Sequence, residues 1–202
     1  MSKSGQDAEP MPLPTLKLYE CYARLEDCIE KWEEVSEIGL RALSMVCQSV
    51  PQIEHLVPAQ DHAINYPTFA SKTEASIEVL LESAASLQKC LESMQEVMDE
   101  AKGFTRGIGA SKDGVEKVLL NRGQSQSKCS ASDWINFLSV QFEMYKADYQ
   151  MKRGICQKIT EDKVVRHNHV MKMKLMWEHQ PSIDEAVVGY INERLKHDHV
   201  LS

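Results

Sequence analysis

Apolar residues recur at alternating spacings of three and four along three stretches of this chain. This spacing is typical of α-helices that pack along one stripe, as in coiled coils and helical bundles. We therefore expect three long helices with a buried seam on each. The seam positions are Leu18, Tyr22, Leu25, Ile29, Trp32, Ser36, Gly39, Leu43, Val46 and Val50 in the first stretch; Ile77, Leu80, Ala84, Leu87, Leu91, Met94, Met98 and Ala101 in the second; and Ile135, Leu138, Phe142, Tyr145 and Tyr149 in the third.

Proline and capping residues set the expected ends of the first two helices. The first helix should cover about 15–50 and end at Pro51, because proline lacks the N–H that a helix interior needs. Ser71 with Glu74 forms a capping-box pattern, which should start a second helix over about 71–102.

The rest of the pattern predicts a third helix and a helical hairpin at the C-terminal end. Ser132, followed by an acidic residue, should cap a helix over about 132–159. Apolar periodicity then predicts two shorter helices over about 161–177 and 182–197, and Pro181 should separate them.

These elements predict an all-α fold, an elongated antiparallel helical bundle or coiled coil with a C-terminal helical hairpin. Only nine glycines and seven prolines interrupt the 202 residues, so helix propensity permits such a fold. We expect a single helical domain over 15–202, with irregular linkers at about 51–70 and 103–131. The prolines of residues 1–14 predict a disordered tail before it.

Charge is distributed unevenly along the chain. Residues 1–104 carry 8 Lys/Arg and 18 Asp/Glu, whereas residues 105–202 carry 15 and 12. The first helix is the acidic extreme, and the segment 146–174 is the basic one. These charges are either solvated helix faces or, for the basic segment, a docking face for an acidic partner. The net charge of −7 argues against direct nucleic-acid binding, because the phosphate backbone repels an acidic protein.

Cysteine usage and hydropathy predict a soluble, intracellular protein. The six cysteines are scattered without a C-x-x-C pair, so we expect reduced thiols rather than disulfides. No apolar run approaches the length of roughly 18 residues that crosses a bilayer, and the first residues do not resemble a signal peptide. We therefore expect no membrane association.

The sequence contains no known catalytic signature, and we expect neither catalysis nor a cofactor. The pairs His167/His169 and His197/His199 would point about 200° apart on a helix, so we expect no metal site there. The glycine-rich run 103–112 lacks the phosphate-loop pattern and follows no strand, which makes a flexible linker the better interpretation.

Four short segments carry a resemblance to a known family. They are Lys31-Trp32-Glu33, Glu143-Met144-Tyr145-Lys146, Lys152-Arg153 and Met176-Trp177-Glu178-His179-Gln180-Pro181. In this order they resemble the cyclin-dependent kinase 2-interacting protein family, and the likeness in the order of elements spans about 22–195. The Met-Trp-x-His-Gln-Pro ending is the more specific part of the resemblance.

The resemblance implies a non-catalytic adaptor of the nucleus, with the cytoplasm as a second location. Family members are described as linking a cyclin-dependent kinase with an origin-firing kinase of the Cdc7 type, and as influencing checkpoint signalling. They are also described as one subunit of an AAA ATPase complex, beside a second small helical subunit, in replisome proteostasis and ribosome maturation. The partner-binding residues that the motifs nominate are Trp32, Tyr145, Lys152, Arg153, Trp177, His179 and Pro181.

Two questions stay open at this level. Trp177 either closes the bundle or is an aromatic hot spot of an interface, and Trp32 divides in the same way. The alternative to the adaptor is a generic coiled-coil tether or scaffold that self-associates through the second helix. Because a lone helix with a narrow apolar stripe cannot stabilise itself, we also expect part of a seam to stay exposed for a partner.

Overall fold

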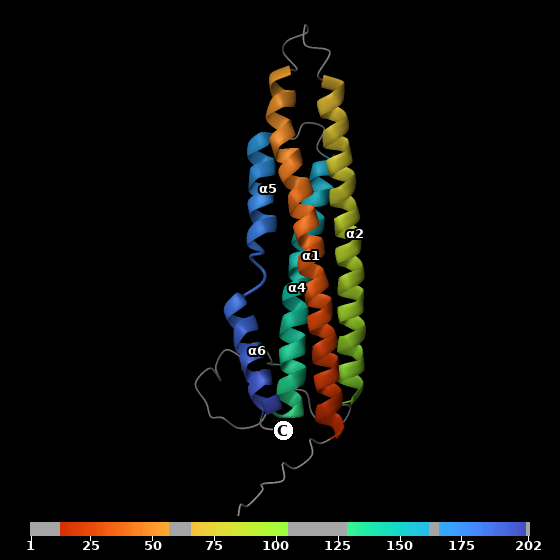
Figure 1. Ribbon diagram of the computed structural model, residues 1–202, viewed down its shortest axis with the longest axis vertical. Coiled ribbons are helices and arrows are strands. Elements are labelled where there is room, and N and C mark those ends of the chain that lie inside the picture. The colour runs from red at the N-terminus through yellow and green to blue at the C-terminus, as the bar shows by residue number, and fades with distance from the viewer. Residues whose placement is uncertain (1–12, 57–65, 105–128, 162–165, 201–202) are drawn as a thin grey trace, which may run out of the picture. The chain divides into compact units, whose positions relative to one another are not determined.

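Five α-helices form the described part of the chain. The computed structural model describes residues 13–56, 66–104, 129–161 and 166–200, and no strand occurs in these ranges. The all-α prediction is confirmed. The helices are α1 (Leu13–Leu56), α2 (Tyr66–Phe104), α4 (Ala131–Glu161), α5 (His167–His179) and α6 (Glu185–Val200), as Figure 1 shows.

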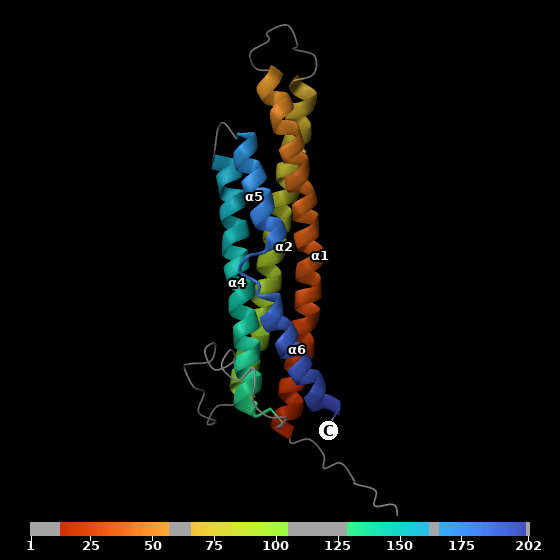
Figure 2. The ribbon, with the colours of Figure 1, turned by 90° about the vertical axis from the view of Figure 1, so that its left-hand side faces the viewer.

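The helices gather into two compact units, and α1, α2 and α4 each contribute a segment to both. In each unit the α1 and α2 segments run in opposite directions, as the chain colours of Figures 1 and 2 show. The helix α6 completes one unit, and the helix α5 completes the other. We call them the α6 unit (Met1–Asp27, Met94–Met144 and Ile183–Ser202) and the α5 unit (Cys28–Ser93 and Tyr145–Ser182), and describe only their residues in the ranges above.

The seam of α1 agrees with the sequence pattern. All of its predicted positions are buried except Ile29, which is partly exposed. The acidic residues of this helix, from Glu20 to Glu37, lie on its exposed side. The first helix is therefore amphipathic in the way its residue pattern predicts.

Five of the eight predicted seam positions of α2 are buried, whereas Ile77, Ala84 and Leu91 are partly exposed. Beside each of these three, the buried residue lies one position earlier, where a small polar side chain or a cysteine stands that an apolar pattern overlooks. Ser76 and Ser83 donate hydrogen bonds to carbonyl oxygens one turn earlier, which satisfies their buried hydroxyls. The observed seam is Ser76, Leu80, Ser83, Leu87, Cys90, Met94, Val97, Met98 and Ala101.

The seam of α4 extends further than predicted and becomes polar. Four of the predicted positions are buried, whereas Tyr149 is partly exposed. The three-and-four spacing continues towards the end of the helix through ionisable side chains that the apolar pattern could not include. The observed seam is Trp134, Leu138, Gln141, Tyr145, Asp148, Lys152, Ile155 and Ile159.

The predicted end of the first helix at Pro51 is wrong, because α1 continues through this proline to Leu56. Proline removes the hydrogen bond to the carbonyl four residues earlier, which belongs to Cys47. The Nδ1 of His167 lies 3.2 Å from that carbonyl oxygen and can donate the missing hydrogen bond. A side chain of α5 thus replaces the helix's own donor.

The predicted linkers and tail need correction at their ends. Residues 51–56 and 66–70, expected to be irregular, are helical, and residues 103 and 104 still belong to α2. The helix α1 begins at Leu13, because Pro14 lies in the first turn, where no N–H is required. The remainder of the predicted tail and linkers lies outside the described residues, apart from residues 129 and 130.

Helix starts in the C-terminal half also differ from the prediction. Ser130, not Ser132, caps α4, since it exchanges hydrogen bonds with Asp133 in a reciprocal capping box. Asp184 caps α6, because its Oδ1 accepts hydrogen bonds from the backbone N–H groups of Ala186 and Val187, at 3.0 and 3.1 Å. The helix expected from 161 begins only at His167. The helix α5 ends before Gln180, which has the left-handed conformation with φ 41°. A helix end just before Pro181 was predicted.

Candidate functional site

A buried ion pair lies on α4 within the α5 unit. Asp148 and Lys152 occupy positions i and i+4 of the helix, and both side chains are 0% exposed. The Nζ of Lys152 lies 2.7 Å from Oδ2 of Asp148. Such a pair is unfavourable in a core unless other polar contacts compensate for the lost hydration of both ions.

Ser36 of α1 supplies the nearest of these polar contacts. The Nζ of Lys152 donates a hydrogen bond to its hydroxyl oxygen. The Nε2 of Gln180, the residue that ends α5, donates to the same oxygen at 3.3 Å. One small seam residue thus connects α1 with α4 and with the end of α5.

Two indole rings cover the ammonium group. Its Nζ lies 5.4 Å from the ring centroid of Trp32 and 5.3 Å from that of Trp177. Aromatic faces attract cations at such distances, and the attraction increases where water is excluded. Tyr145 extends the aromatic cluster, because its ring meets that of Trp32 edge to face at a centroid distance of 5.5 Å.

Gly39 makes room for Trp177. A Cβ atom at this position would overlap the Cζ2 atom of the indole, so only glycine permits the observed contact. The indole Nε1 donates a hydrogen bond of 2.9 Å to the backbone oxygen of Ser36. The ring is therefore fixed against α1 by shape and by a directional contact.

Burial sets the electrostatics of the cluster. Desolvation raises the pKa of Asp148, and the neighbouring Lys152 counteracts this shift. Desolvation likewise lowers the pKa of Lys152, and the carboxylate counteracts it. The indole N–H of Trp32 also favours the ionised carboxylate, although it is not aligned as a well-formed hydrogen bond. Burial raises the pKa of Tyr145 as well. Each charged partner thus depends on the other.

The structure divides the seven nominated residues into two groups. Trp32, Tyr145, Lys152 and Trp177 meet in the buried cluster, whereas Arg153, His179 and Pro181 are exposed. In this conformation the buried four have the contacts of residues that close a bundle, and the exposed three remain accessible to a partner. A role of any of the seven in partner binding stays a prediction.

Sequence reasoning overlooked the partner of Lys152. Asp148 lies one helical turn before Lys152 and follows the same three-and-four spacing as Leu138 and Tyr145. Its spacing could therefore have identified it as a seam residue. An acidic residue there was not recognised because an apolar pattern assigns charges to solvent.

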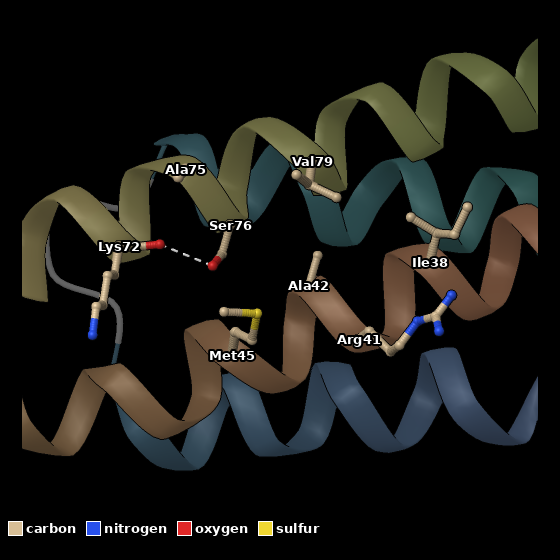
Figure 3. Close-up of a pocket in the computed structure, with 8 residues that line it drawn as sticks. All are labelled: Ile38, Arg41, Ala42, Met45, Lys72, Ala75, Ser76 and Val79. Atoms are coloured by element: carbon tan, nitrogen blue, oxygen red, sulfur yellow. Dashed lines mark hydrogen bonds between the residues drawn. The ribbon is translucent and has the colours of Figure 1, made fainter.

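An open groove lies on the surface of the same unit, between α1 and α2. Its volume is about 340 Å³, and Figure 3 shows its eight lining residues. The lining is mostly apolar, and the two charged members are both cations. The lining residues are Ile38, Arg41, Ala42, Met45, Lys72, Ala75, Ser76 and Val79.

Exposed large apolar side chains concentrate in the α5 unit. Seven of the eight that the described residues contain belong to it, and Leu16 is the exception. None occupies a position of the three predicted seams, where only Ile29, Ile77, Ala84, Leu91 and Tyr149 are partly exposed. That a partner covers part of a seam stays a prediction. The seven are Ile38, Met45, Val79, Leu81, Met171, Leu175 and Met176.

Three cysteines of the α5 unit are buried and weakly acidic. Burial raises the pKa of Cys156 to about 11, and it raises the pKa of Cys47 and Cys90, so these thiols are poor nucleophiles at neutral pH. The six cysteines form no disulfide. Within the described ranges no group of three His, Cys, Asp or Glu residues is placed to hold a metal ion.

Comparison with known proteins does not identify a relative. No protein-family model and no curated protein matches the chain. In the described part of the chain, no helix has both the length and the apolarity needed to cross a membrane.

Proposed function

We propose that this chain is a non-catalytic adaptor subunit that binds other proteins through the surface of its α5 unit. One observation carries the proposal: three large apolar side chains, Ile38, Met45 and Val79, are exposed around a groove of this unit. Scattered exposed apolar residues are ordinary, whereas a group of them around a concavity favours an interaction site.

The kinds of partner follow from the sequence resemblance. We propose that the chain joins AAA ATPase subunits and a second small helical subunit in an assembly that serves replisome proteostasis and ribosome maturation. We further propose contacts with a cyclin-dependent kinase and an origin-firing kinase, which would place the chain in replication and checkpoint signalling in the nucleus. The motif from Met176 to Pro181 supports this, because it ends α5 beside the exposed apolar residues of that helix.

The alternative function, a self-associating tether, has less support. It requires the α2 seam to be available to a second copy. Leu80, Leu87 and Met94 of this seam are 0% exposed within the chain itself, so self-association through them would require the bundle to open.

Affinity purification of the tagged chain from its own cells at native salt, with quantitative mass spectrometry, tests the proposal. We expect two AAA ATPases and a second small helical protein at near-stoichiometric levels. Recovery of kinases and replication factors without the ATPases would favour the kinase-linking role. Recovery of the bait alone would contradict the adaptor function.

A further inference from the structure

We propose that the groove between α1 and α2 binds one amphipathic helix of a partner protein, whose apolar stripe is flanked by acidic residues. The inference rests on the proposed adaptor function and assigns it a binding surface. Three features of the groove carry it: the spacing of its lining residues, the small size of some of them and the sign of its charges.

The lining residues follow the spacing of a helix-packing surface. On α1 they are Ile38, Arg41, Ala42 and Met45, and on α2 they are Lys72, Ala75, Ser76 and Val79. Each helix thus contributes positions i, i+3, i+4 and i+7, which form one ridge along its surface. Two such ridges on antiparallel neighbours enclose a trough into which a third helix can insert side chains, as in knobs-into-holes packing.

Small side chains line part of the groove. Ala42 and Ser76 lie between the two helices, and around them lie the larger Ile38, Met45 and Val79, as Figure 3 shows. These three are 42%, 53% and 39% exposed, so their apolar surface is available to a partner. A helix-in-groove complex needs this combination, because small residues admit the apolar anchors of the incoming helix.

The charges of the groove indicate an acidic partner. Arg41 and Lys72 are the only charged residues among the eight that line it. Arg41 has a carboxylate neighbour, Glu37, at 3.8 Å, but both side chains are 68% exposed, so water competes with this contact. Incoming Glu or Asp residues beside the apolar stripe would meet these cations, which lie towards opposite ends of the groove in Figure 3. Complementary charge of this kind guides orientation and association rate.

Replacement of Val79 by glutamate, with Leu81→Glu as its matched control, tests the groove. Both residues lie on α2 and have similar exposures of 39% and 42%, but only Val79 lines the groove. In affinity purification of the full chain, we expect Val79→Glu to reduce the recovery of one helical partner at least about tenfold. Leu81→Glu should retain it. Arg41→Glu combined with Lys72→Glu should weaken recovery more at low salt than at high salt.

Photo-cross-linking identifies the occupant. Benzoylphenylalanine placed at position 79 of the full-length chain should cross-link, in cells, to a partner segment with apolar residues at helical spacing and Asp or Glu beside them. The same probe at position 81 should not cross-link to that segment. A cross-link to a basic segment, to an extended segment or to a second copy of this chain would overturn the inference.

The outcomes separate this inference from the adaptor function. If the wild-type chain recovers its partners and Val79→Glu recovers them equally well, the adaptor function stands and the groove is not its binding surface. Equal losses in Val79→Glu and Leu81→Glu would also overturn the groove. If the wild-type chain recovers no partner, both proposals fail together.

Discussion

The two units share three helices but build their cores differently. In the α6 unit, aromatic and aliphatic side chains pack together: Trp134 meets Tyr19 and Tyr22 edge to face at 6.1 and 6.0 Å, and Phe137 meets Tyr190 at 6.3 Å. In the α5 unit, an ion pair lies in the core and apolar side chains lie on the surface.

The comparison shows that the same helices can be specified in two ways. Apolar packing tolerates changes of similar volume, whereas a buried ion pair with directional contacts permits fewer arrangements. We infer that the polar cluster restricts the α5 unit to one arrangement. If this is correct, variants of the cluster and variants of the aromatic core should respond differently to pH.

Breaking the ion pair should have the largest effect on stability. Lys152→Met leaves the Asp148 carboxylate buried without its cation, and we expect a loss of about 3–5 kcal/mol in the free energy of unfolding. The exposed Lys158→Met on the same helix is the matched control, with an expected change within about 0.5 kcal/mol. Urea titration followed by circular dichroism measures both. Equal small effects would show that the pair does not specify this unit.

The two single variants of the pair should depend on pH with opposite signs. In Lys152→Met the pKa of Asp148 lies further above its ordinary 3.8, so the folded state binds the extra proton and stability falls as pH rises. In Asp148→Asn the pKa of Lys152 lies further below its ordinary 10.5, so the unfolded state binds the extra proton and stability rises with pH.

Unfolding free energies measured between about pH 5 and about pH 8 test these signs. Trp134→Ala in the α6 unit is the comparison variant: we expect a loss of about 3–5 kcal/mol from the missing ring, without either slope. Slopes of the same sign in both ion-pair variants would contradict the electrostatic account.

Replacement of Gly39 tests the fit of Trp177 and should have an intermediate effect. Gly39→Ala improves helix propensity but places a methyl group where the indole lies, and we expect a net loss of about 1–3 kcal/mol. Gly154→Ala is the control in the same unit, because nothing lies within 4 Å of its added Cβ, and it should gain up to about 1 kcal/mol. Similar gains in both variants would refute the fit. Tryptophan fluorescence reports the ring's environment.

The smallest effect should come from His167, which supports the helix at Pro51. His167→Ala leaves the carbonyl of Cys47 without this donor, and we expect a loss of about 1 kcal/mol. The exposed His169→Ala is the control on the same helix. Hydrogen exchange in the last turns of α1 should increase in the first variant and not in the second.

Prediction from sequence succeeded where burial and apolarity coincide. The seam of α1 was found because Leu and Val hold its buried positions, and the stop after α5 was found because Pro181 restricts Gln180. It failed at Ser76 and Ser83, whose hydroxyls bond within their own helix, and at Asp148, whose charge is compensated by a residue one turn away. In each failure, a local contact makes a polar residue acceptable in a core.

Distant contacts limited the prediction of the candidate site. The continuation of α1 past Pro51 depends on His167, and the role of Gly39 depends on Trp177, both far along the chain. The groove also escaped prediction, since its lining lies off the predicted apolar seams and forms only when α1 and α2 are paired. Motif reasoning nevertheless nominated four residues of the buried cluster, because Trp, Tyr and Lys stood out in short segments.

Hydrogen exchange with mass spectrometry, comparing the free chain with the assembly purified from cells, tests the central claim most directly. We predict new protection in residues 38–45 and 72–79 of the α5 unit, and unchanged exchange in the α1 and α4 segments of the α6 unit. Protection confined to the α6 unit, or no change in either unit, would contradict the assignment of partner binding to the α5 unit.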